Sequence, residues 1–252
     1  MSRRLEFAAM SSDTAPINLT HHFLIAMPGL NDELFGKSVV YLCEHSARGA
    51  LGLIINKPAD IGLGELFDRL DLQLRRADLQ GAPLMRGGPI QTERGFVLHE
   101  AMGEAKAFGS DETPPALREA IREALGSLER VASPSLLTEP AESDGAPEDV
   151  KPETPSAYAS SLRIDGGLEM TTSRDVLEAL SSGAGPRKVM VSLGYSSWGE
   201  GQLESELAEN SWLTVAADPA VIFDTPIEQR YDKAMALLGL ESWMLAPGAG
   251  RA

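Results

Sequence analysis

Apolar and polar positions follow two different periods along this chain, and each period predicts its own kind of element. Runs rich in β-branched and apolar residues, bounded by glycine, proline or polar residues, are typical of strands. Such runs lie at 38–45, 50–56, 187–195 and 211–218, and "HHFLIAMPG" marks the start of ordered structure. Other stretches repeat apolar residues at helical spacing. They cover 63–72, 171–180, 201–209 and 225–240.

Two of these helices carry terminal signals. Ser173 is expected to be the N-cap of the second helix. In the last helix, Thr225 is the expected cap, Pro226 takes the first position and Gly239 ends the helix. Because strands and helices alternate irregularly, and the early strands are close in sequence, we expect a mixed α+β domain rather than a regular parallel sheet.

Segment 104–157 differs from the rest of the chain. It carries 12 acidic residues against 5 Lys and Arg, which makes it an acidic insertion. Residues 115–131 predict one amphipathic helix, and the residues after it have too few apolar groups to order themselves. The insertion is either a solvated linker or an arm that presents a helix to a protein partner. Around it we expect a flexible tail at 1–17, a domain at 18–240 and a second tail at 241–252.

The charge of the chain limits its partners. Its 252 residues include 22 Lys and Arg and 37 Asp and Glu, for a formal charge of −15. Such a surface repels a phosphate backbone, and the basic residues form no cluster in the sequence larger than a pair, so nucleic-acid binding is not expected. A single cysteine excludes an internal disulfide. No apolar run approaches the roughly 20 residues of a membrane span, so we expect a cytoplasmic protein without membrane contact.

The stretch "LGYSSWGEGQLESELAENSWL" at 193–213 joins a strand to a helix through a glycine-rich turn. A nucleophile elbow around Ser196 fails because Trp198 stands where a glycine is needed. A phosphate loop fails because Glu200 replaces the lysine, and the dinucleotide pattern also fails. We therefore expect a structural turn with Trp198 as its apolar anchor. The glycines available to it are Gly194, Gly199 and Gly201.

Two further groups of residues are candidates for chemistry. Cys43 and His45 are two apart on a predicted strand, so they are expected on the same face, either as the start of a thiol or metal site or as a buried inert cysteine beside a histidine. Lys57, Arg86 and Arg94 could converge on a small anion, or pair with surface carboxylates. No metal signature and no cofactor motif is present.

Several long runs resemble the YqgE/AlgH family of bacterial proteins. They are "FLIAMPGLNDELFGKSVVYLCEHSARGALGLIINKP", "GGPIQTERGFVLH", "TTSRDVLEAL", and "LGYSSWGEGQLESELAENSWL" with "IFDTP", from about Asn18 to Leu240. The resemblance implies one α+β domain with a bifurcated sheet, a small barrel-like part and helices packed around it. The family is often labelled a transcriptional regulator, through an association with alginate production, and the resemblance implies no established reaction. Its members usually have a short loop in place of the 104–157 insertion.

The resemblance also marks signature positions, which serve here as candidate binding residues without a catalytic role. They are Asn56, Lys57, Gly87, Gly88, Arg94, His99, Thr172, Ser173, Tyr195, Trp198, Gln202 and Glu204.

Two hypotheses follow. The first is a non-enzymatic regulatory or interaction protein that binds protein partners through the glycine-rich surface or the 115–131 helix. The second is an enzyme or a binder of a small anion or metabolite. It requires one pocket that contains Lys57, Arg94, His99, Thr172 and Tyr195.

Overall fold

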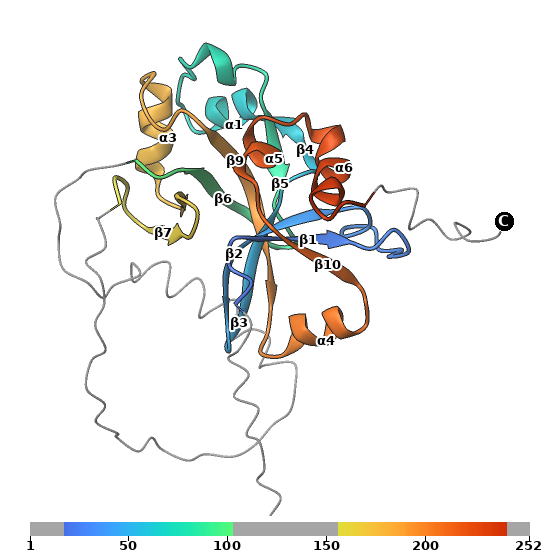
Figure 1. Cartoon of the computed structure of the whole chain (residues 1–252). Helices are drawn as coiled ribbons and strands as arrows, with labels where there is room; N and C mark the ends of the chain where they lie inside the picture. Colours follow the sequence, from blue (N-terminus) through green and yellow to red (C-terminus); the bar gives the residue numbers. More distant parts are fainter. Residues whose placement is uncertain (1–17, 103–155, 241–252) are drawn as a thin grey trace, which may run out of the picture.

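Strand β9 (Val189–Trp198) is the centre of the fold because it pairs with three neighbours (Figure 1). The computed structural model describes residues 18–102 and 156–240. The last residues of β9 pair antiparallel with β3 (Gly49–Ile54), and most of its length pairs antiparallel with β6 (Ile90–Glu100). On the same strand, β5 (Pro83–Arg86) pairs in parallel. The sheet is therefore mixed and branches at β9.

The remaining strands extend this sheet in two directions, in the order β10-β1-β2-β3-β9-β6-β8-β7. They curl around the core, as Figure 1 shows. On one side lie β10 (Trp212–Ala216), β1 (His22–Ala26) and β2 (Val39–Ser46); on the other lie β8 (Leu168–Thr171) and β7 (Ser161–Ile164); β4 (Pro58–Gly62) pairs with β5.

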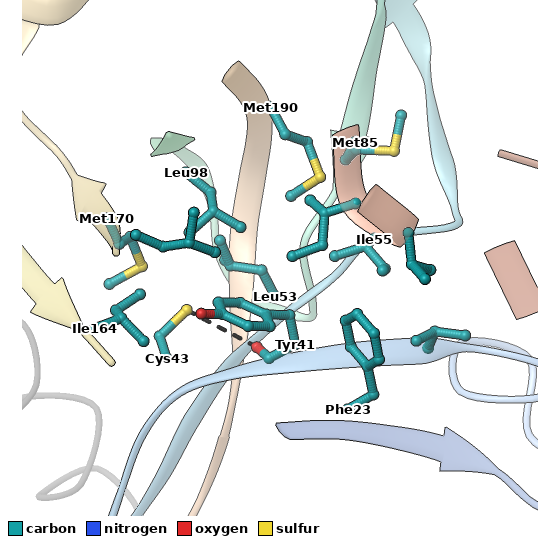
Figure 2. Close-up of a cluster of buried hydrophobic side chains, with 14 of the residues drawn as sticks. Phe23, Tyr41, Cys43, Leu53, Ile55, Met85, Leu98, Ile164, Met170 and Met190 are labelled. Atoms are coloured by element: carbon teal, nitrogen blue, oxygen red, sulfur yellow. Dashed lines mark hydrogen bonds between the residues drawn. The ribbon is translucent and has the colours of Figure 1, made fainter. Parts of the chain in front are cut away.

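Helices cover the faces of the sheet and close three apolar clusters. They are α1 (Leu63–Arg69), the 3-10 helix η1 (Ala77–Leu79), α3 (Arg174–Ser181), α4 (Gln202–Ala208), α5 (Pro219–Phe223) and α6 (Ile227–Leu237). The largest cluster lies between the sheet and α5 and α6 (Figure 2). A second lies under α4, and a third under α1 and α3. The α+β single domain expected from the sequence is confirmed.

Two local predictions were wrong. Gly194 does not belong to the glycine-rich turn, because β9 continues to Trp198 and Gly194 lies inside the strand with φ of 70°. Thr225 does not cap α6, whose N-cap is Pro226. The Thr225 hydroxyl donates instead to the Ala220 carbonyl (3.0 Å), because α5 ends directly before it.

Two other terminal predictions were confirmed in position. Ser173 occupies the N-cap position of α3. Its hydroxyl donates to the Asp175 carboxylate and does not accept a hydrogen bond from a backbone N–H of the helix. Gly239 follows α6 with φ of 69°, as a helix-ending glycine should.

Several predictions lie outside the described residues. These are the tails, the 115–131 helix and the rest of the insertion up to residue 155. Among residues 18–102 and 156–240, no helix is long and apolar enough to cross a membrane.

Candidate functional site

Asn56 and Lys57 hold the turn that precedes β2. The Asn56 side-chain oxygen accepts a hydrogen bond from the Val39 N–H (2.8 Å), and its nitrogen donates to the Lys37 carbonyl (2.8 Å). The Lys57 ammonium donates to the Gly36 carbonyl (2.7 Å). Lys37 has a left-handed φ of 54°, so this turn needs such support. Both signature side chains are engaged within the protein.

Gly87 and Gly88 allow two backbone segments to cross in contact. The Gly87 N–H donates to the Leu193 carbonyl (2.8 Å). A Cβ on Gly87 would lie 2.2 Å from the Gly194 oxygen, and a Cβ on Gly88 would lie 2.2 Å from the Tyr195 carbonyl carbon. No side chain fits at either position, so these glycines are required for the close approach.

Glu206 connects α4 to the sheet through two tryptophans. One of its carboxylate oxygens accepts the indole N–H of Trp198 (2.9 Å) and that of Trp212 (2.7 Å). Gln202 adds a second link, since it accepts the Gly199 N–H (3.0 Å) and donates to Glu206 (3.0 Å). The prediction of Trp198 as a buried anchor is confirmed. Sequence reasoning missed Glu206, because nothing in the local pattern separates it from the other glutamates of α4.

Glu204 pairs with a histidine whose protonation state follows from geometry. The Leu19 N–H donates to His45 Nδ1 (3.0 Å), so Nδ1 must carry a lone pair. The proton therefore lies on Nε2, which donates to Glu204 Oε1 (3.0 Å). His45 is neutral with both ring nitrogens occupied, which leaves neither free to act as a general base.

Cys43 and His45 lie on opposite faces of β2, so the prediction that they share a face was wrong. The cause is a β-bulge between Leu42 and Glu44, which reverses the alternation of side chains after Cys43. Cys43 packs in the large cluster of Figure 2, where burial raises the pKa of its thiol and keeps it protonated. In the described part of the chain, no group of three or more His, Cys, Asp or Glu side chains is placed to hold a metal ion.

Arg94, Thr172 and Tyr195 lie close to one face of β6. The Arg94 guanidinium donates to the Thr172 hydroxyl (3.3 Å) and to the Gln91 side chain (3.4 Å). Its central carbon lies 5.9 Å from the centroid of the Phe96 ring, which packs against the ring of Tyr195 at 5.2 Å. Both hydrogen bonds of Arg94 are long, so its charge is held loosely.

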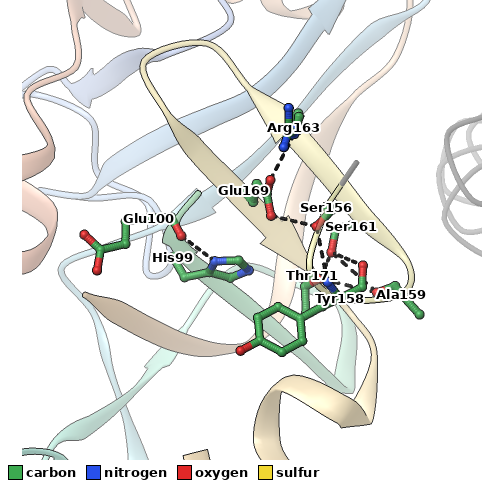
Figure 3. Close-up of polar contacts among 9 residues, drawn as sticks. All are labelled: His99, Glu100, Ser156, Tyr158, Ala159, Ser161, Arg163, Glu169 and Thr171. Atoms are coloured by element: carbon green, nitrogen blue, oxygen red, sulfur yellow. Dashed lines mark hydrogen bonds and ion pairs between the residues drawn. The ribbon is translucent and has the colours of Figure 1, made fainter. Parts of the chain in front are cut away.

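His99 lies on the other face of β6, under the segment before β7 (Figure 3). It is fully buried, and its Nδ1 donates to the Glu100 carbonyl (2.8 Å). Its ring meets the ring of Tyr158 edge to face at 5.6 Å. Burial lowers the pKa of His99, which keeps the imidazole neutral. Among the described residues, its Nε2 has no hydrogen-bond partner.

Glu169 lies opposite His99 across the β6–β8 pair and is also fully buried. Its carboxylate accepts from the Ser156 hydroxyl (2.7 Å) and from Arg163 Nε (3.0 Å), as Figure 3 shows. These bonds attach residue 156, where the described chain resumes, to the β7–β8 hairpin. The sequence analysis missed Glu169 because nothing in the sequence distinguishes it from the many exposed acidic residues of this chain.

The five residues of the hypothetical pocket are therefore not all brought together. Arg94, Thr172 and Tyr195 share one side of the sheet. His99 lies on the opposite face of β6, and Lys57 is bound to a turn next to β2.

Arg230 is a buried charge that the sequence did not reveal. On α6 it reads as an ordinary helix-surface residue, but it is only 7% exposed. Its guanidinium donates to the Thr225 carbonyl (3.0 Å) and to the Ile55 carbonyl, and it contacts the sulfurs of Met85 (4.0 Å) and Met190 (3.9 Å). Burial lowers the pKa of Arg230 to about 10, so it stays charged and ties α6 to the end of β3.

Known proteins resemble this chain in sequence and in fold. A family model described as AlgH-like matches residues 23–134 and 145–243. The chain belongs to this AlgH-like family. A UPF0301 protein of Paracidovorax citrulli is 64% identical over 243 residues, which is 96% of this chain and 100% of the relative. A UPF0301 protein of a Polaromonas species is 59% identical over the same shares.

Solved structures also match the AlgH-like chain. The solution structure of the AlgH protein from Pseudomonas aeruginosa is 38% identical, with a TM-score of 0.59 over 95% of this chain and 98% of that one. A crystal structure of a protein from Corynebacterium diphtheriae is 16% identical, with a TM-score of 0.53 over 86% and 85%. The second match shows the fold alone.

Proposed function

We propose that the protein acts by binding another protein, in a regulatory role, and not by catalysing a reaction. The observation that carries this proposal is the way Glu206 fixes α4 against the sheet through Trp198 and Trp212. A surface that is already rigid loses little conformational entropy on association, which favours binding.

Acidic residues flank α4. Glu200 lies just before the helix and Glu209 is its C-cap residue; both are exposed, as is Ser205 on the helix between them. Between residues 189 and 229 the chain holds seven Asp and Glu and no Lys, Arg or His. Such a surface attracts a positively charged partner and repels nucleic acid, which supports a protein partner over direct DNA binding.

The engagement of the signature side chains also supports a structural scaffold. Asn56, Lys57 and Gln202 hold loops, and the His45–Glu204 pair holds the end of β2 next to α4. A general base or nucleophile needs a reactive atom within reach of a substrate. In these residues the reactive atoms are bound to the protein itself.

Photo-crosslinking in the native host tests the proposal. A benzophenone side chain replaces Ser205 on α4, and the matched control replaces Asp68, which is exposed on α1. We expect a discrete product from position 205 alone, and less of it at high salt and in the E200Q/E209Q background. No product from position 205, or the same product from both positions, would contradict the proposal.

A second candidate function rests on Arg94. Its only polar contacts among the described residues are the two long bonds to Gln91 and Thr172, and it is half-buried, so it could bind a small anion. Calorimetric titration with inorganic phosphate and with citrate tests this. Binding that is lost in R94Q and kept in R86Q would establish it, because Arg86 is an exposed arginine at the end of the neighbouring β5.

A further inference from the structure

Strand β10 ends the sheet and has one unpaired edge. Its odd-numbered residues bond to β1, as the bonds from Ala217 N to His21 O (3.0 Å) and from Met27 N to Ser211 O (3.0 Å) show. In an antiparallel ladder the residues between them direct both backbone groups the other way. No hydrogen bond to these outward groups occurs within residues 18–102 and 156–240. The outward residues are Trp212, Thr214 and Ala216.

The two faces of β10 are partly covered while its edge is open: Trp212 is buried and Ala216 is exposed, with the residues between them half-buried. On one face, Leu213 and Val215 pack against the large cluster, as do Tyr231 of α6 and its C-cap residue Leu238. On the other face, Trp212 packs in the cluster under α4. Figure 1 shows β10 between α6 and α4. An incoming strand would therefore find a formed backbone ladder between two helices.

This edge lacks the features that normally prevent pairing. Proteins protect free edges with charged residues or proline. The opposite edge, β7, contains Arg163, and the outer strand β4 contains Pro58 and Asp60. By contrast, residues 211–217 read "SWLTVAA", with no charge and no proline. The edge of β10 is suited to strand addition.

Charge around the edge decides which partner fits. Glu209 lies before β10 and Asp218 after it, and both are exposed. If two copies paired antiparallel through the outward residues of β10, Glu209 of one copy would lie about one residue from the position opposite Asp218 of the other, and this proximity of like charges disfavours the pairing. An extended segment with Lys or Arg at its ends meets both acids favourably.

We propose that the outer edge of β10 binds an extended, basic-flanked segment of a partner protein by strand addition. This inference rests on the proposed function and gives it a binding mode. The segment alternates apolar and polar residues, because its side chains point in turn toward the α6 side and the α4 side.

Residue-resolved amide exchange tests the proposal. The probe is an acetylated peptide of alternating Val and Thr with Lys-Arg at each end, and the control peptide carries Glu-Glu at each end. In the free protein, the amides of Trp212, Thr214 and Ala216 should exchange fast, and those of Leu213 and Val215 slowly. The basic peptide should slow the first three, and the acidic peptide should not.

Each other outcome overturns the proposal. Protection of the outward amides in the free protein would mean that the edge is already covered. Protection that rises with protein concentration would indicate a second copy, and protection that does not would indicate a segment of this chain. No protection by the basic peptide, equal protection by both peptides, or slowing of both sets of amides alike would exclude strand addition by a basic segment.

Two variants separate this binding mode from the proposed function. T214P removes the outward N–H at an edge position, where proline is tolerated, and T214V keeps that N–H. We expect about tenfold weaker binding of the basic peptide to T214P, and no change in T214V. Failure of the peptide to bind would leave the cross-link from position 205 in place. Loss of that cross-link would contradict the proposed function itself.

Discussion

Replacing Glu206 by alanine should destabilise the domain more than any other carboxylate removal on α4. The substitution leaves the indole N–H groups of Trp198 and Trp212 without an acceptor. Both side chains are nearly buried, at 3% and 5% exposure, so water reaches them poorly. It also removes the acceptor of the Gln202 amide.

The expected magnitude follows from the two indole bonds. A hydrogen bond to a charged group contributes about 1.5–3 kcal/mol. Because Glu206 is only half-buried, water replaces part of the lost interaction, and the lower value applies to each bond. The E206A variant should therefore lose about 3 kcal/mol of its free energy of unfolding. E206Q keeps an acceptor oxygen but loses the charge, so its loss should be about half as large.

Urea unfolding measures these losses. The transition is followed by tryptophan emission and by far-UV circular dichroism on the same samples, with the slope of the transition checked for constancy. The matched control is E209A, which removes an exposed carboxylate just after the same helix. We expect E209A to stay within about 0.5 kcal/mol of the parent protein.

The reasoning fails if E206A and E209A unfold at the same urea concentration. It also fails if E206Q is as damaging as E206A, because the acceptor oxygen that glutamine keeps would then contribute nothing without the charge. The order E209A, E206Q, E206A in rising destabilisation would support the carboxylate as the link between α4 and the sheet.

Three further predictions concern single positions. G88A should cost at least about 3 kcal/mol, because its Cβ would lie 2.2 Å from the Tyr195 carbonyl carbon, whereas G95A, with no atom within 4 Å of the added Cβ, should change thermal stability little. Burial lowers the pKa of His99, so as the pH falls the unfolded chain takes up this proton before the folded protein does. At pH values below about 6.5, the free energy of unfolding should therefore decrease by up to about 1.4 kcal/mol per pH unit. The H99N variant keeps the hydrogen-bond donor but does not titrate, so urea titrations should show a smaller decrease. Cys43 should resist iodoacetamide in the native protein and react in urea, and fast native labelling, measured by mass spectrometry, would contradict its burial.

Local patterns in the sequence predicted most elements because those patterns reflect local physics. The α3 helix has its N-cap residue and its apolar spacing within ten residues, and the structure places it at Arg174–Ser181. The errors arose where a residue's contacts depend on a neighbouring element and not on its own element. Thr225 was misplaced because α5 offered its hydroxyl another acceptor, and Gly194 because pairing with β6 extends β9 through it.

The site could be predicted only as a set of positions. The family resemblance marked Trp198 and Glu204, but their partners Glu206 and His45 come from helix orientation and from a bulge, which one sequence does not show. The alternation of side chains between the two faces of β2 is reversed at a single inserted residue. As a result, His45 lies on the face toward α4 and not on the face of the large cluster. A one-residue irregularity thus decides whether a histidine faces a thiol or a glutamate.

The alternation of residues along the strands β2 and β10 connects the two proposals. His45 and Glu204 fix one end of α4, Glu206 fixes it against β10, and the outward amides of β10 alternate with those that bond to β1. If α4 were loosened, its C-cap residue Glu209 would lose its fixed position beside the β10 edge, and a charged partner would be recognised less well. The residues that stabilise α4 therefore belong to the same surface as the open edge of β10. A substitution of Glu206 should weaken binding of the peptide at Thr214, although Glu206 stabilises the helix and Thr214 lies on the binding edge.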